Sequence, residues 1–250
     1  MTKVKIEPDK ILANFLRGSL TDINSSRSGT YIFPDFPRVK SLGNTEFPRI
    51  GITIISEDGK FLGMHDDDTR HKVVLQIDVI AKKDQIYSVT TTSEALGTMS
   101  STANSSRMTF NQIPTTITNI KHTSTSYGTT TAVEEDANFT TPASLAAGTV
   151  QWSKATGNLN FSSADVSSHN GEAITSTYVV KMEGKKVCQY LARTIVKLIK
   201  NNHRTADTLK GMFDPVLMSN VPMPLEEDLG IYRQVVEYEF TMYNIGEDIQ

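Results

Sequence analysis

The chain has 250 residues, with 25 Lys and Arg against 28 Asp and Glu and a formal net charge of −3. A charge so near neutral gives no electrostatic reason to expect nucleic acid or a membrane surface as a bulk partner. The single cysteine, Cys188, excludes an intrachain disulfide, and no apolar run approaches the roughly 20 residues of a membrane span. The N-terminal stretch lacks the apolar segment of a signal peptide. These features fit a chain made in a reducing cytosol.

The N-terminal part of the chain carries one helical pattern followed by two strand patterns. Apolar residues at helical spacing over 9–23 predict an amphipathic helix that begins near Pro8. Alternating isoleucines over 50–54 predict a strand, and Ser-Glu-Asp-Gly-Lys at 56–60 predicts a turn. A longer alternation over 73–80 predicts a second, half-buried strand.

The composition of the chain changes at about residue 88 and again at about residue 178. The stretch that follows Ser88 is rich in Ser and Thr and shows no helical periodicity. Short alternating segments predict strands at 113–120, 138–140, 149–152 and 173–180. Several short strands joined by polar turns are typical of a small antiparallel sandwich. We therefore expect residues 88–178 to form an inserted, Ser/Thr-rich β-sandwich domain.

The chain after this segment returns to longer periodic elements. An apolar stripe over 183–202 predicts a helix, and alternation over 231–244 predicts a strand. Between them, VPMPLEEDLG at 221–230 predicts a loop or a hairpin tip. Residues 1–87 and 179–250 therefore predict a discontinuous α+β core, in which two helices pack on one face of a mixed or antiparallel sheet.

Three stretches of this core together resemble one protein family: PRIGITIISEDGKFLGMHDDDTRHKVVLQIDVIAK (48–82), VCQYLARTIVKLIKNN (187–202) and DLGIYRQVVEYEFTMYN (228–244). Preceded by the helix at 9–23, this order of strand pair, helix and terminal strand is similar to that of the tail terminator, or tail completion, proteins of long-tailed viruses. The segment DANFTTPASLAAGTVQWS (136–153), followed by AITSTYVV, resembles β-sandwich modules of virus structural proteins. Members of the terminator family usually lack so large an insert, and the Ser/Thr-rich insert suggests an archaeal virus.

The resemblance implies a virion structural protein that is not an enzyme and needs no cofactor. Terminator subunits form rings, usually hexamers, that cap the tail tube and meet the connector on the head side. The expected partners are therefore further copies of this chain, the tail tube protein and the head-side connector or adaptor. The implied location is the head–tail junction of the virion, after assembly in the host cytoplasm, and DNA would pass through the ring without specific binding.

The most polar cluster of the core lies between the two predicted strands, at His65, Asp66, Asp67, Asp68, Arg70 and His71. A cation site is one interpretation, but the cluster lacks the alternating acids, central Gly and terminal Glu of a calcium loop. Three adjacent carboxylates also diverge in an extended chain. A solvated bend is the plainer interpretation. The resemblance implies a third, in which Arg70 and His71 pair with acids across a subunit interface.

A second acidic group, at Glu226, Glu227 and Asp228, lies in the predicted loop before the last strand. The loops 64–71 and 221–230 are the expected interface tips. Their acidic residues would line the channel of a ring, where negative charge lets DNA slide without adhering.

Enzymatic signatures are weak in this sequence. It contains neither a G-x-S-x-G elbow nor a phosphate-binding loop, and Cys188 within a helical stripe is expected to be a small buried hydrophobe. Trp152 alternates with Val150 and is expected in the core of the sandwich. Two other functions remain open: a different head–tail adaptor or tail tube subunit, and a carbohydrate-binding or adhesin module that stacks sugars on Trp152, Tyr127 and Phe139.

Overall fold

The computed structural model divides into two compact units, each described here by itself. The core unit consists of Met1–Tyr87 with Met182–Gln250, and the inserted unit consists of Ser88–Lys181. These bounds lie within a few residues of the composition changes at 88 and 178. The residues that the structure describes are 7–24, 27, 29–35, 42–61, 69–101, 107–123, 125–202, 209 and 211–244.

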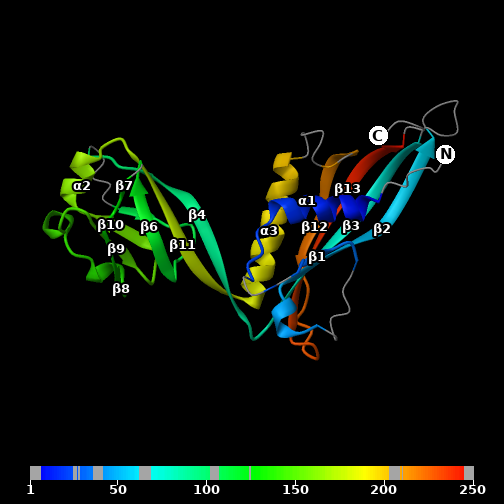
Figure 1. Ribbon diagram of the computed structural model, residues 1–250, viewed down its shortest axis with the longest axis horizontal. Coiled ribbons are helices and arrows are strands. Elements are labelled where there is room, and N and C mark those ends of the chain that lie inside the picture. The colour runs from blue at the N-terminus through cyan, green and yellow to red at the C-terminus, as the bar shows by residue number, and fades with distance from the viewer. Residues whose placement is uncertain are drawn as a thin grey trace. The chain divides into compact units, whose positions relative to one another are not determined.

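The core unit is built on a five-stranded sheet with the strand order β1-β2-β3-β13-β12 (Figure 1). Strands β1 and β2 are parallel, and every other neighbouring pair is antiparallel. The strands are β1 (Ile32–Phe33), β2 (Arg49–Phe61), β3 (Thr69–Lys82), β12 (Met212–Pro222) and β13 (Ile231–Asn244). The helices are α1 (Pro8–Ser19), the 3-10 turn η2 (Asn44–Glu46) and α3 (Gly184–Asn202). The core unit is therefore an α+β fold, as expected.

The two faces of this sheet differ because side chains alternate along each strand. On one face, Val73, Leu75, Ile77 and Val79 of β3 are fully buried, and the helices α1 and α3 pack against this face (Figure 1). The opposite face carries polar side chains from β3 and β13, most of them half-buried. The half-buried strand predicted over 73–80 is thus confirmed as part of β3, with one face covered by helices.

Both helices form where the apolar stripes predict them. Pro8 occupies the first turn of α1, where its missing N–H is not needed, and Leu12 and Leu16 are completely buried. Helix α3 buries its apolar stripe through Val187, Leu191, Ile195 and Ile199. It begins at Gly184, where an added Cβ would lie 2.1 Å from the carbonyl oxygen of Lys82. Only glycine lets the start of α3 approach the end of β3 so closely.

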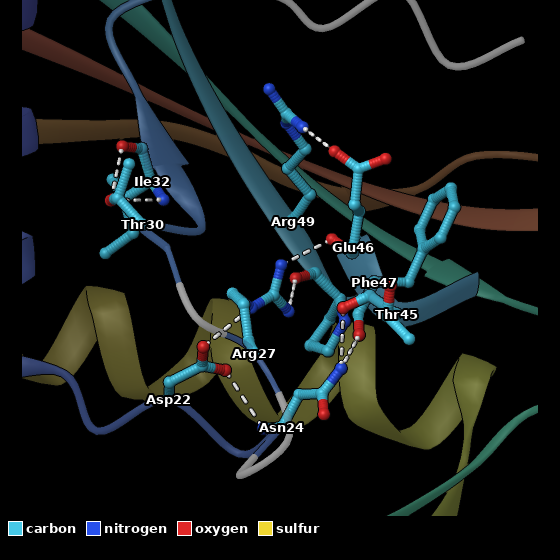
Figure 2. A network of polar contacts seen from close by, with 10 residues as sticks. Asp22, Asn24, Arg27, Thr30, Ile32, Thr45, Glu46, Phe47 and Arg49 are labelled. Carbon is cyan, nitrogen blue, oxygen red and sulfur yellow. Dashed lines mark hydrogen bonds and ion pairs between the residues drawn. The ribbon is translucent and has the colours of Figure 1, made fainter. Parts of the chain in front are cut away.

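A polar network fastens the segment after α1 to the segment that leads into β2 (Figure 2). The guanidinium of Arg27 donates to Asp22 Oδ2 at 2.6 Å and to the carbonyl oxygens of Glu46 and Pro48. The side-chain amide of Asn24 donates to the carbonyl oxygens of Thr45 and Phe47. These bonds satisfy backbone groups of a non-repetitive segment that has no ladder of its own.

The inserted unit consists of two four-stranded sheets, with the orders β5-β10-β9-β8 and β4-β11-β6-β7. The pair β8–β9 is parallel, and the other registered pairs are antiparallel. The strands are β4 (Ile86–Thr98), β5 (Arg107–Thr109), β6 (Thr116–His122), β7 (Thr125–Ser126), β8 (Thr129–Val133), β9 (Thr149–Ser153), β10 (Asn158–Phe161) and β11 (Ala173–Glu183). Its short helices are η3 (Asp136–Asn138), η4 (Pro142–Ser144) and α2 (Ser163–Ser168).

Aromatic side chains join the two sheets into a sandwich-like core. The rings of Phe110 and Tyr178 meet edge-on at 4.8 Å, and those of Tyr127 and Phe161 lie 5.4 Å apart. Trp152 is 6% exposed. Its expected place in the core is confirmed, and a buried indole offers no open face for a sugar ring.

Several local predictions are wrong. Residues 56–60 do not form a turn, because β2 continues beside β3 to Phe61. Residues 138–140 are not a strand: Asn138 ends the 3-10 turn η3, and the next two residues belong to no helix or strand. The helix α2 was not predicted, nor were the strands β1, β4, β5, β7, β8, β10 and β12. In the inserted unit, the parallel pair β8–β9 departs from the expected purely antiparallel arrangement.

Candidate assembly interface

Strand β12 is an edge strand of the core sheet, and many of its apolar side chains face solvent. It pairs with β13 on one side and has no strand neighbour on the other among the described residues. Val216 is 50% exposed and Met218 is 56% exposed. The large hydrophobic side chains exposed on β12 and directly after it are Phe213, Val216, Leu217, Met218, Val221 and Met223. An exposed apolar edge strand is a ready site for pairing with another chain.

The backbone of β12 is irregular at two places. Its register with β13 shifts between Phe213 and Val216 and again between Leu217 and Ser219. Asp214, in the first irregular stretch, has a φ of 47°, and Pro215 follows it with no N–H to donate. Such bulges and prolines are the devices by which edge strands limit uncontrolled pairing. The edge of β12 is therefore exposed, but its backbone is irregular at two places.

At the opposite edge of the same sheet, β2 has no strand neighbour over most of its length among the described residues. Strand β1 covers β2 only at Ile50 and Gly51. Beyond that point, Ile54 and Ile55 are exposed, and the β2–β3 register is irregular just after Ile54. The sheet thus exposes apolar side chains at both edges, along β12 and at Ile54 and Ile55 of β2, after which β2 continues with the polar run 56–60.

The acidic residues before the last strand lie on a tight turn between β12 and β13. Glu226 forms an antiparallel bridge with Ile231, and Leu229 and Gly230 donate back to the carbonyl oxygens of Glu226 and Glu227. Glu227 and Asp228 are exposed, whereas Glu226 is half-buried. The side chain of Lys82 holds this turn by donating to the carbonyl oxygen of Leu229 at 3.2 Å. The predicted hairpin tip is confirmed.

The cluster between β2 and β3 is described only in part. His65, Asp66, Asp67 and Asp68 lie outside the described residues. Arg70 and His71 were expected in the loop 64–71, but both lie in β3. The β2–β3 ladder extends to the pair Phe61 and Thr69. His71 Nδ1 lies 3.6 Å from Glu57 Oε1, so this imidazole has an acidic neighbour in its own chain.

The start of β3 and the acidic hairpin tip lie at opposite ends of β13. Thr69, which directly follows Asp68, pairs with Asn244 at one end of β13, whereas Ile231, beside the hairpin tip, pairs with Lys82 at the other end. At a rise of about 3.3 Å per residue, these two ends of β13 lie about 40 Å apart along the sheet.

A shallow pocket of about 390 Å³ continues the apolar surface beyond the end of β12. Met223, Leu225 and Tyr232 contribute to its apolar lining, and Lys185 and Arg233 carry positive charge at its wall. Cys188 also contributes but is only 2% exposed, and burial raises the pKa of its thiol to about 12. The prediction that Cys188 is a small buried side chain is confirmed.

No protein family model, curated protein or solved structure matches the chain. Within the described part of the chain, no helix combines the length and the apolar character that crossing a bilayer requires.

The sequence indicates both the loops at the tips of the sheet and its edge strands in general as interfaces, but it does not identify β12 as the edge strand. The run Val216-Leu217-Met218 was a usable signal, since three consecutive apolar residues beside prolines suggest an exposed edge strand. Periodicity does not identify this stretch as a strand, because β12 shows no alternation between a buried and a solvated face.

Proposed function

We propose that this protein is a virion structural subunit, a tail terminator whose copies form a ring that caps the tail tube and joins it to the head-side connector. The observation that carries the proposal is that, among the described residues, both outer strands of the core sheet expose apolar side chains, along β12 and at Ile54 and Ile55 of β2. Two different surfaces on opposite sides of one unit permit head-to-tail association, and such association yields a ring when the rotation between neighbours closes.

The element order of the core unit supports the same proposal. A leading helix, a long antiparallel strand pair, a second helix and a terminal strand follow one another as the resemblance to terminator proteins requires. The inserted unit interrupts this order between β3 and α3 without removing an element. We propose a ring of six copies, which is the usual number in that family.

We assign the hairpin tip to a face of the ring that meets partners or DNA. Glu227 and Asp228 are exposed there, and within the described part of the chain neither forms an ion pair that would neutralise it. Carboxylates at a channel lining repel phosphates, so DNA would pass without binding. We propose the same role for Asp66, Asp67 and Asp68, which lie outside the described residues.

The proposal is tested by the oligomeric state of the purified full-length chain, measured by sedimentation velocity and negative-stain microscopy. We expect discrete rings. Long polymers would favour a tail tube subunit, and a persistent monomer would contradict self-assembly altogether. The double substitution Val216→Lys and Met218→Lys should abolish the rings, because charged side chains on an edge strand oppose its pairing with another chain. Ile113→Lys, at an exposed apolar residue of the inserted unit, is the matched control and should leave the rings intact.

A mixing experiment separates head-to-tail association from a symmetric dimer. Ile55→Lys on β2 should also abolish the rings. An equimolar mixture of the β12 variant and the β2 variant should form dimers and nothing larger, because only one intact pair of edges remains. If β12 instead pairs with β12 of a second copy, the Ile55→Lys chain alone will still dimerise and the ring proposal is wrong.

An adhesin has less support. Trp152, the side chain best suited to stack on a sugar, is buried in the inserted unit. A glycan-array signal that disappears when residues 88–181 are removed would revive this alternative.

A further inference from the structure

The inserted unit brings together two histidines and one glutamate that the assembly proposal does not use. His122 is the last residue of β6, His169 directly follows α2, and Glu172 directly precedes β11. One potential ligand atom from each residue lies within 4.8 Å of the other two. It is the only group of three or more His, Cys, Asp or Glu side chains with such convergence in the described part of the chain.

Both imidazoles direct the same type of nitrogen at one carboxylate. His122 Nδ1 lies 2.8 Å from Glu172 Oε2, and His169 Nδ1 lies 3.3 Å from Glu172 Oε1. The two imidazole rings stack with their centroids 3.6 Å apart and their planes tilted by 32°. All three side chains are only part-buried, so an ion from solvent can reach them.

The backbone around the group fixes the three side chains. Ile174 pairs with His122 in the β6–β11 ladder, which sets Glu172 beside the end of β6. The turn from His169 to Glu172 is closed by a hydrogen bond from the Glu172 N–H to the His169 carbonyl oxygen. Gly171 within this turn has a φ of 86°, and its N–H donates to the carbonyl oxygen of Met99. The positions of the three side chains are therefore set by the β6–β11 pairing, by the hydrogen bond from Gly171 to Met99 and by the tight turn from His169 to Glu172.

A further contact has the character of an outer shell around a metal site. The hydroxyl of Thr123 donates to Glu172 Oε2 at 3.0 Å, which fixes the carboxylate that both imidazoles approach. Carboxylate ligands in metal sites are commonly held by such second hydrogen bonds. The ring of Tyr127 packs edge-on against His122 at 5.3 Å and covers one side of it.

We propose that His122, His169 and Glu172 bind one zinc ion, with a fourth position open to water. A tetrahedral zinc with Zn–N bonds of about 2.0–2.1 Å places its ligand atoms about 3.3 Å apart. The distances of 2.8 and 3.3 Å between the nitrogens and the carboxylate oxygens are close to that spacing. The two stacked rings must open slightly to admit the ion. Each imidazole then gives up its hydrogen bond to Glu172 and binds the ion through an unprotonated Nδ1, with its proton on Nε2.

The ligand types favour a first-row transition metal over calcium or magnesium. Two imidazoles and one carboxylate suit zinc and similar first-row ions, whereas calcium and magnesium require mostly oxygen ligands. Three protein ligands with one open position differ from the closed four-ligand sites that zinc needs for purely structural roles. In this chain the ion would join β6 to the turn before β11, so zinc should stabilise the inserted unit.

The test uses zinc chloride alone with the full-length chain, in isothermal titration calorimetry and thermal melts. We expect one zinc per chain and a rise of several degrees in the Tm of the inserted unit. Cobalt should give the visible absorption of a tetrahedral site. His169→Gln and Glu172→Gln should each weaken zinc binding about 100-fold, and Thr123→Ala, which removes only the outer contact, about tenfold. His71→Gln, at a histidine of the core unit, is the matched control and should change nothing.

The alternative to be excluded is a group held together by hydrogen bonds only. In that case zinc produces no stoichiometric heat and no Tm shift beyond that of the Glu172→Gln chain, and the proposal is overturned. Binding that persists unchanged in both His169→Gln and Glu172→Gln would place the metal elsewhere and overturn it equally. Circular dichroism of each variant without zinc shows whether a loss of binding arises from a loss of folding.

Discussion

Arg233 donates a hydrogen bond from Nε to Asp78 Oδ1 at 2.6 Å, and the Asp78 side chain is 0% exposed. The two residues lie on the neighbouring strands β13 and β3, on the face of the sheet that the helices do not cover. Gln76 donates to the other oxygen, Oδ2, at 2.9 Å. A fully buried carboxylate is thus held by one cation and one amide.

Removing that cation should destabilise the core unit strongly. Arg233→Ala leaves Asp78 buried with only Gln76 as a donor, and we expect a loss of about 3 kcal/mol in the free energy of unfolding. Urea denaturation followed by circular dichroism measures the loss. Arg193→Ala, on the exposed face of α3, is the matched control and should change stability by less than about 0.5 kcal/mol. Equal effects of both substitutions would show that the Asp78 contact contributes little.

Two glycines in helices should respond to alanine in opposite directions. At Gly184, a Cβ would meet the Lys82 carbonyl oxygen at 2.1 Å and force α3 away from β3, so Gly184→Ala should destabilise the protein by more than about 1 kcal/mol. At Gly18, no atom lies within 4 Å of the added carbon. Gly18→Ala should therefore stabilise α1 by up to about 1 kcal/mol. The signs of the two Tm shifts test the close approach of α3 to the sheet.

The thiol of Cys188 should be unreactive in the folded protein. It is buried, contacts the Tyr232 carbonyl oxygen at 3.4 Å, and its pKa is raised to about 12. At pH 8 the folded chain should react with a thiol reagent at least 100-fold more slowly than the chain in denaturant, since the thiolate is the reactive form. Equal rates in the two states would show that α3 does not stay packed against β13.

The inserted unit should lose stability in acid through Asp136. Hydrogen bonds from Thr156 and then Asn158 lower the pKa of this carboxyl below its ordinary value of 3.8. A depressed folded-state pKa stabilises the fold above the unfolded-state value, and this stabilisation disappears as the pH falls through the folded-state value. Asp136→Asn should therefore lower the Tm at pH 6 but not at the acid end of the titration. The exposed neighbour Glu135, as Glu135→Gln, should show no such pH-dependent difference.

The core unit should fold without the inserted unit. Strands β4 and β11, which carry the chain out and back, are neighbours in one sheet, so a short Gly/Ser linker can replace residues 88–181. We expect a cooperative unfolding transition and an α+β circular dichroism spectrum. A shortened chain that is unfolded in native buffer would show that the two units do not fold independently.

The sequence allowed the long periodic elements to be predicted and little beyond them. Strands β3 and β13 and helices α1 and α3 each bury one continuous face, so their periods are visible without tertiary information. Strand β12 has no such face: its apolar side chains remain exposed, and two register shifts and Pro215 interrupt its alternation. The polar run 56–60 looked like a turn, but pairing with β3 keeps it extended.

The candidate metal group could not be predicted because its members are distant in the sequence. His122 lies 50 residues from Glu172, and only the β6–β11 pairing makes them neighbours. The spacing of three residues between His169 and Glu172 was the sole local signal, and such pairs are common in turns. At the other site, the Asp-rich run drew attention because its residues are consecutive, although consecutive side chains diverge in an extended chain.

The adjacency of β4 and β11 also bears on the order in which the polypeptide acquires its structure. Strand β3 and helix α3 are separated by a loop of about 100 residues, and closing so long a loop from a random coil is entropically unfavourable by about 2 kcal/mol more than closing one of ten. If the sandwich forms first, its paired outgoing and returning strands hold Tyr87 and Met182 near each other. The remaining helix and strands then have fewer conformations to sample before they pack, so a folded inserted unit would lower the entropic cost of folding the core unit.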